Sequence, residues 1–215
     1  MTAATQPSPL TPDPKYSNLP TDAAVERAAA HLKEHGFEVV VVATAEEARN
    51  EVLSRIPASS SVLDLTSRTL EETGVLKALA ERSDIDLVKS RARSMDRTTQ
   101  AAEIRRMTQA PDIALGSVHA VTEDGYVLVA SATGSQIGPY SFGAGRVIWV
   151  VGAQKVVPNL EEGFRRLERY ALPLEDERAR QVYGVGSSLN RVLVFRRENQ
   201  PGRTTLILVR QKVGF

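Results

Sequence analysis

Short apolar runs alternate with amphipathic segments along most of this chain. The run Val39–Val42 is β-branched and unbroken, which is typical of a strand buried on both faces. The apolar residues before it recur at helical spacing and stop at Gly36, a residue suited to a helix C-terminus. After it, Thr44-Ala-Glu-Glu47 forms a capping box that predicts a helix ending before Pro57.

The same alternation continues through the middle of the chain. Strands are expected over residues 61–65 and 85–88, and helices over about 69–82 and 96–107. Strands that alternate with helices of this length predict right-handed βαβ units around a parallel sheet.

The second half has a different pattern. Apolar runs at 113–117, 120–122 and 126–131 lie close together, and Asp124-Gly125 between the last two predicts an antiparallel hairpin. A buried strand is expected over 146–151, followed by helices beginning at Pro158 and Pro173. The first helix is expected to bury one face, made of Val157, Leu160, Phe164, Leu167 and Ala171. Strands over 191–195 and 204–209 complete the pattern.

These elements predict a single α/β domain over residues 21–215, in which helices flank a mixed, largely parallel sheet. Its cleft should lie at the carboxyl ends of the strands. Residues 1–20 carry five prolines among small polar residues and are expected to be a disordered leader.

Composition narrows the classes of function. The net charge of +1 does not favour a nucleic-acid partner. The absence of cysteine excludes disulfides, thiolate catalysis and cysteine-bound zinc or iron–sulfur clusters within this chain. The apolar runs are too short to span a bilayer and no signal peptide is visible, so we expect a cytoplasmic protein.

A glycine-rich segment over residues 133–145 is the first candidate ligand site. Such a loop lets backbone N–H groups approach a phosphate or carboxylate, here at Gly134 and Gly138, while Ser135 and Gln136 add side-chain hydrogen bonds. The alternative is a tight connection that needs glycine for its backbone angles. The glycine spacing does not fit a dinucleotide-binding fingerprint.

Two further candidates flank this loop. Lys155 follows the strand expected at 146–151 and could hold an anion at the sheet edge, or lie solvated beyond it. Glu123 and Asp124 could supply a nucleophile or a base, although an acidic pair before glycine is more often a solvated turn.

The remaining candidates carry weaker signals. Ser187 and Asn190 could orient a ligand, or belong to a loop after a helix. His119 is placed for proton transfer near the hairpin, or is structural. His31 and His35 lie four residues apart on a polar helix and are read as surface residues, so no metal site is expected.

Six basic residues lie between positions 89 and 106. The basic residues could form a solvated or oligomer-contact face, or raise the local anion concentration. They are Lys89, Arg91, Arg93, Arg97, Arg105 and Arg106. No Gly-x-Ser-x-Gly elbow occurs, so a serine triad is not expected.

Several motifs together resemble the LUD-domain family, named for lactate utilisation. They are Glu123-Asp-Gly125, Ser131-Ala-Thr-Gly134, Val147–Val151 and, most specific of all, Gly152-Ala-Gln-Lys-Val-Val-Pro158. The resemblance implies a fold related to ribose-phosphate isomerases, glucosamine-phosphate deaminases and coenzyme-A transferases. In those transferases a glutamate in a similar turn forms the acyl intermediate, and Glu123 would correspond to it.

The resemblance implies a subunit or accessory protein in the utilisation of lactate or a similar small organic acid. An anionic metabolite would bind in the glycine-rich cleft. Because this chain lacks cysteine, electrons in any redox role would pass through separate iron–sulfur or oxidoreductase subunits. The alternatives are a stand-alone transferase or isomerase for coenzyme-A thioesters or sugar phosphates, and a non-catalytic scaffold. The sequence identifies no cofactor and leaves a homo-oligomer open.

Overall fold

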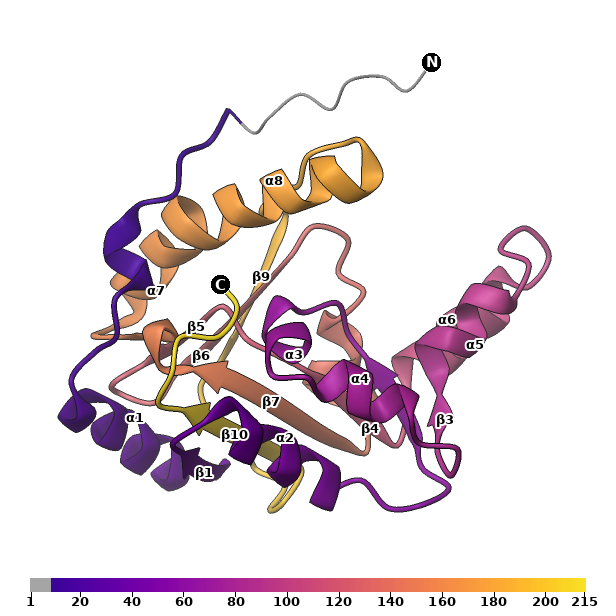
Figure 1. Cartoon of the computed structure of the whole chain (residues 1–215), viewed down its shortest axis with the longest axis horizontal. Coiled ribbons are helices and arrows are strands. Elements are labelled where there is room, and N and C mark those ends of the chain that lie inside the picture. Colours follow the sequence, from indigo (N-terminus) through magenta and orange to yellow (C-terminus); the bar gives the residue numbers. More distant parts are fainter. Residues whose placement is uncertain (1–8) are drawn as a thin grey trace.

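The computed structural model describes residues 9–215 and contains two sheets (Figure 1). The main sheet has six strands, all parallel, in the order β1-β10-β7-β4-β2-β3. In that order the strands are Glu38–Val42, Thr204–Val209, Arg146–Gly152, Ile113–Gly116, Ser61–Asp64 and Asp86–Leu87. The α/β class predicted from the sequence is confirmed.

A second, four-stranded sheet has the order β8-β5-β6-β9. Its strands are Val156–Val157, Ala120–Thr122, Val127–Ser131 and Arg191–Phe195. The predicted Asp-Gly hairpin joins β5 to β6 in antiparallel pairing, and Gly125 adopts the positive φ of 84° that the turn requires. The sequence pattern did not indicate that the hairpin belongs to a sheet of its own.

Alternation along the central strands explains how the layers pack. In β7, Ile148 and Val150 face the helices on one side, while Val147, Trp149 and Val151 face the second sheet. The opposite face of the second sheet packs against the helical segment around Leu167. The molecule is therefore a stack of helices, main sheet, second sheet and C-terminal helices.

The structure has eight α-helices within residues 9–215. They are α1 Asp22–Glu34, α2 Ala45–Ser54, α3 Arg68–Glu72, α4 Val75–Ala80, α5 Val88–Ser94, α6 Ala101–Gln109, α7 Leu160–Arg166 and α8 Leu172–Tyr183. Side chains of Thr21, Thr44, Ser67 and Asn159 cap the N-termini of α1, α2, α3 and α7. In the described part of the chain no helix is both long and apolar enough to cross a membrane.

Two helical expectations need correction. The helix expected over 69–82 is divided into α3 and α4 because Gly74 has a φ of +74°, which interrupts the helix. The helix expected over 96–107 begins only at Ala101, because the Asp96 carboxylate accepts from Thr98 and Thr99 in a turn that precedes it. Helix α5, directly after β3, was not expected, since its sequence has no apolar repeat. Helices α5 and α6 project together from the body of the molecule (Figure 1).

The expected buried face of the helix after Pro158 is also partly wrong. That helix begins at Leu160, and Phe164 is 39% exposed, whereas Gly163 and Arg166 are buried. Gly163 packs against Leu128, where a Cβ atom would lie 3.1 Å from two of its carbons. Close approach at this glycine rotates the buried face away from Phe164.

The N-terminal segment is more ordered than its composition predicts. Pro14–Ser17 form a 3-10 helix, and Tyr16 is only 5% exposed, packed beside Tyr170. The expectation of disorder is therefore corrected for this stretch, while residues 1–8 lie outside the described residues.

Candidate functional site

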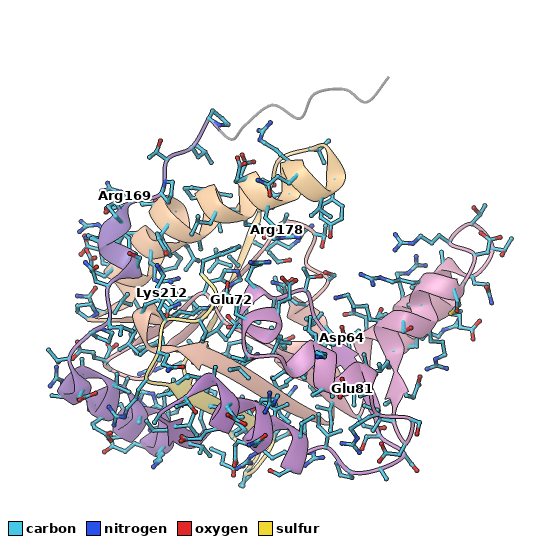
Figure 2. The ribbon with its side chains drawn as sticks, viewed as in Figure 1. Asp64, Glu72, Glu81, Arg169, Arg178 and Lys212 are labelled. Atoms are coloured by element: carbon cyan, nitrogen blue, oxygen red, sulfur yellow. The ribbon has the colours of Figure 1, made fainter. Side chains whose placement is uncertain are left out.

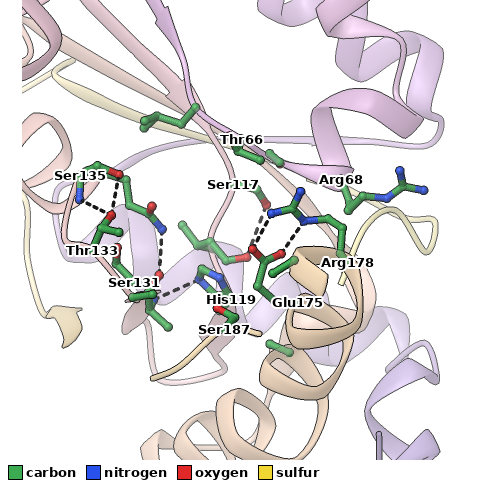
Figure 3. Close-up of a pocket in the computed structure, with 18 of the residues that line it drawn as sticks. Thr66, Arg68, Ser117, His119, Ser131, Thr133, Ser135, Glu175, Arg178 and Ser187 are labelled. Atoms are coloured by element: carbon green, nitrogen blue, oxygen red, sulfur yellow. Dashed lines mark hydrogen bonds and ion pairs between the residues drawn. The ribbon is translucent and has the colours of Figure 1, made fainter. Parts of the chain in front are cut away.

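A pocket of about 580 Å³ opens where the carboxyl ends of β2, β4 and β7 meet the second sheet and α8. Its walls come from segments far apart in the sequence (Figure 3). They include residues 63–69, 117–119, 130–133, 135–136 and 186–189, together with Lys155 and one face of α8. This is the edge of a parallel sheet at which ligands usually bind, as the sequence analysis expected.

Lys155 lies on the floor of this pocket, in a 3-10 turn that follows β7. It is 1% exposed, and its Nζ contacts Thr69 Oγ1 at 2.9 Å, Ser117 Oγ at 2.9 Å and the Val118 carbonyl at 3.1 Å. Burial and the nearby charge of Arg166 hold the pKa of Lys155 well below its ordinary value, while Glu72 acts weakly in the opposite direction. All three contacts are to uncharged oxygens.

Arg166, at the end of α7, is a second buried basic side chain beneath the pocket. It is 0% exposed and donates to the carbonyl oxygens of Gln154 and His119. Its guanidinium carbon lies 5.1 Å from the centre of the Tyr170 ring, and its Nη2 has no hydrogen-bond partner among the described residues. Burial lowers the pKa of Arg166 to about 10, so the side chain remains charged at neutral pH.

His119 lines the same pocket, two residues after Ser117. The Ala130 N–H lies 3.1 Å from its Nδ1, which must therefore accept, so the ring carries its proton on Nε2. Burial, together with the charges of Lys155 and Arg166, lowers the pKa of His119 to about 3. The imidazole is neutral at physiological pH and can donate a hydrogen bond from Nε2.

Basic side chains predominate around the pocket. Six basic residues line it, against two acidic ones, Asp64 and Glu175. The six are Arg68, Lys89, Arg93, Arg97, Lys155 and Arg178. Arg178 projects from α8 and is paired with Glu175 at 2.6 Å (Figures 2 and 3). Lys89 lies 3.6 Å from Asp64, whereas Arg93 and Arg97 form no ion pair within residues 9–215.

The glycine-rich loop contributes side chains to the pocket, but not its glycines. Ser135 and Gln136 line the cavity, and the Gln136 side chain donates to the Ala130 carbonyl at 2.8 Å. Gly134 and Gly138 are not among the lining residues. A Cβ atom at Gly138 would lie 1.9 Å from Gln109 Oε1, so this glycine allows close packing against the end of α6.

The loop after α8 is divided in the same way. Ser187 lines the pocket, and its backbone N–H donates to Asp176 Oδ1 at 2.7 Å. Asn190 lies outside the lining, and its side chain donates to the Ala132 carbonyl at 3.1 Å.

Glu123 is placed away from the pocket. Its carboxylate pairs with Arg27 of α1 at 2.6 Å, and its carbonyl contacts His31 Nδ1 at 2.6 Å. His35 Nδ1 contacts the Gly125 carbonyl at 3.0 Å, so both histidines of α1 hold the tip of the hairpin. In the described part of the chain, no group of three histidines and carboxylates gathers as a metal site would require. Glu123 therefore stabilises the contact between the hairpin and α1, and it does not line the cavity.

Three polar residues of this region were missed in the sequence. Arg166 is one of two adjacent arginines on a helix whose polar face was assumed to be solvated, and Thr69 was assigned only to a helix. Ser117 was treated only as the last residue of the apolar run at 113–117. The position of Ser117 directly after a buried strand was the one available signal, because strand carboxyl ends border the cleft.

The parallel sheet and the polar groups at its carboxyl edge define an α/β protein with a polar pocket. The model of the LUD domain matches residues 25–209, and this chain belongs to the LUD domain family. Its fold is similar to the crystal structure of a DUF162 family protein from Deinococcus radiodurans, with a TM-score of 0.56 at 13% sequence identity. The alignment covers 89% of this chain and 99% of that one. No curated protein matches the chain in sequence.

Proposed function

We propose that the pocket binds a small organic anion, and that the protein serves as a LUD-type subunit or accessory protein in the utilisation of lactate or a similar organic acid. One observation carries the proposal: six basic and two acidic side chains line the pocket of a chain whose net charge is only +1. Positive charge concentrated in a cleft attracts anions and raises their local concentration.

The positive charges differ in how freely they can meet a ligand. Arg178 is engaged by Glu175, and Lys89 lies beside Asp64. Arg93 on α5 and Arg97 after it are exposed and form no ion pair in the described part of the chain. Guanidinium groups donate two parallel hydrogen bonds to a carboxylate or phosphate, so these two arginines are the expected anion-binding groups.

The volume of the pocket favours a second candidate. Pockets of roughly 300–1,000 Å³ hold drug-sized ligands, and this one has about 580 Å³. A three-carbon acid fills only a small part of that space. A larger anion, such as a coenzyme-A thioester or a sugar phosphate, fits the volume better and supports a stand-alone transferase or isomerase.

The test is isothermal titration calorimetry with L-lactate, pyruvate, coenzyme A, acetyl-coenzyme A and ribose 5-phosphate. The Arg93→Ala/Arg97→Ala double variant should bind the preferred anion at least about tenfold more weakly, the equivalent of about 1.4 kcal/mol. The matched control is Arg105→Ala/Arg106→Ala on α6. It removes the same charge from two exposed residues outside the pocket lining and should change affinity less than about twofold.

If both double variants bound the anion equally weakly, the loss of affinity would follow from the change in net charge alone. That result would contradict binding at the pocket rim. Failure of every anion to bind the wild-type chain would contradict a complete site in this chain, and would favour a pocket completed by a partner subunit.

A further inference from the structure

Ser117 and Lys155 form a close pair at the inner end of the pocket. Ser117 directly follows β4 and is half-buried, and its Oγ lies 2.9 Å from Lys155 Nζ. Both residues line the cavity. A hydroxyl within hydrogen-bond reach of a base, with that base held by further groups, is the arrangement of an activated nucleophile.

The other contacts of Lys155 determine where its lone pair points. The Val118 carbonyl can only accept, so it takes one N–H of the amine at 3.1 Å. Thr69 Oγ1 donates toward the Val213 carbonyl at 3.4 Å and therefore accepts a second N–H from Lys155 at 2.9 Å. A neutral amine has two protons and one lone pair. In the structure the Ser117 hydroxyl donates to the Val118 carbonyl at 3.4 Å and its Oγ accepts from Lys155 Nζ at 2.9 Å. With two N–H groups of the neutral amine taken by Val118 and Thr69, rotation of the Ser117 hydroxyl directs its proton to the remaining lone pair of Nζ.

The surroundings favour the neutral amine. Lys155 is almost completely buried, forms no ion pair within residues 9–215, and lies near the permanent charge of Arg166. Both effects destabilise a second cation on the pocket floor and lower its pKa. Glu72 of α3 acts in the opposite direction, but its carboxylate is engaged by the Gly214 N–H at 2.7 Å.

We propose that Ser117 is a nucleophile and Lys155 its general base, and that the pair transfers the acyl group of an ester or thioester of an organic acid. Lysine serves as the base for serine in some acyl-transfer enzymes, and this arrangement does not need the elbow motif that the sequence lacks. The inference goes beyond anion binding, because it assigns a reaction to the floor of the same pocket.

The steps balance with water as the co-reactant. Ser117 Oγ attacks the acyl carbon and its proton passes to Lys155 Nζ. The bond to the leaving alcohol or thiol breaks, and that group takes the proton from Nζ. Water then attacks the acyl-serine, Lys155 accepts its proton and returns it to Ser117 Oγ, and the free acid departs. The neutral His119, with its proton on Nε2, is the assigned donor for the oxyanion that forms in both halves.

The test uses a serine-directed probe that carries no charge, an alkyl fluorophosphonate, with the full-length protein. Intact mass and peptide mapping should find one adduct, on Ser117. Ser117→Ala should abolish it, and Lys155→Met, which keeps the side-chain volume but removes the base, should slow it at least about 100-fold. Ser188→Ala is the matched control, because Ser188 also lines the pocket but is exposed and forms no hydrogen bond with a lysine among the described residues. It should label like the wild type.

A second readout does not depend on the variants folding. The labelling rate of the wild type should rise with pH as Lys155 loses its proton and should level off well below pH 10.5, the ordinary lysine pKa. The charged or titratable groups that act on Lys155 are Arg166 of α7 and Glu72 of α3, and His119 faces it from the segment before β5.

Absence of an adduct on Ser117 in the folded wild type would overturn the proposal. So would equal labelling in a folded Lys155→Met variant, or a rate that continues to rise through pH 10.5. Anion titration of Ser117→Ala separates this outcome from the proposed binding function, because the variant should keep its affinity whether or not Ser117 reacts.

Discussion

Two buried arginines of this protein are stabilised in different ways. Arg203, which precedes β10, is 6% exposed in its side chain and pairs at 3.1 Å with Glu198, itself 7% exposed. Its Nη2 donates to the carbonyls of Pro139 and Tyr140. Arg166 is equally buried, but it contacts only carbonyl oxygens and an aromatic ring, and one of its nitrogens has no partner among the described residues.

The difference separates a structural charge from a functional one. Burying a charge is costly unless a partner of opposite sign compensates for it, and the Arg203 region supplies that partner. The Arg166 region does not, although the chain has many glutamates. Its uncompensated charge lies beneath the pocket, where it adds to the effect of burial in lowering the pKa of His119 and of Lys155, and favours an incoming anion.

The largest expected effect comes from breaking the compensated pair. Glu198→Ala leaves Arg203 buried without a carboxylate and should lower the free energy of unfolding by about 3–5 kcal/mol. Urea denaturation at pH 7 measures it. Arg166→Met is the counterpart. It removes a buried charge that is not paired with a carboxylate, so the substitution leaves no opposite charge buried without a partner. Its loss should be below about 2 kcal/mol, the cost of two hydrogen bonds less the charge desolvation it relieves. Equal losses in the two variants would contradict the distinction.

A smaller effect should appear in the pH dependence of stability. The pKa of His119 is about 3 in the folded protein, and 6.5 is its ordinary value, so between these values the unfolded chain binds a proton that the folded one does not. Stability should therefore fall as the pH drops from 6.5 towards 3, and His119 should contribute about 3 kcal/mol to the loss between pH 7 and pH 4.

The comparison variant is His119→Gln, whose side-chain oxygen can still accept from Ala130. Between pH 7 and pH 4 the free energy of unfolding of this variant should fall by about 3 kcal/mol less than that of the wild type. Urea denaturation at the two pH values measures both changes. Identical losses in wild type and variant would show that His119 titrates normally and that the nearby cations do not act on it.

The smallest effect is expected at the hairpin. The Arg27–Glu123 pair is partly exposed, and such pairs contribute at most about 1 kcal/mol. Glu123→Gln should therefore change stability only slightly and leave the fluorophosphonate reaction of Ser117 unchanged. A large loss of that reaction would restore Glu123 as a participant and contradict its placement outside the pocket.

Much of the fold could be predicted because its strands carry strong local signals. The β-branched run Val39–Val42 and the apolar run Val147–Val151 both form strands of the main sheet. The second is buried as expected, whereas the first is an edge strand in which only Val39 is fully buried. The interruption at Gly74 was harder to foresee, since glycine inside a helical pattern is often tolerated.

The site was less predictable because its members meet only in three dimensions. Lys155 and His119 were singled out and lie in the pocket, but the three oxygens around Lys155 come from segments near residues 69 and 117. Nothing local in the sequence marks Arg166 as buried, because its burial follows from the close approach of Gly163 to β6. Glu123 was linked to the pocket through its turn, yet the second sheet carries that turn to α1.

The strand order also has a consequence for synthesis on the ribosome. Strand β1 pairs with β10 alone in the main sheet, and the residues that pair are as far apart as Glu38 and Thr205, 167 positions later. At about 5–20 residues per second, β1 waits roughly 10–30 seconds for its partner to be made. During that interval the nascent chain presents an unpaired, valine-rich edge, the kind of surface that chaperones protect from aggregation.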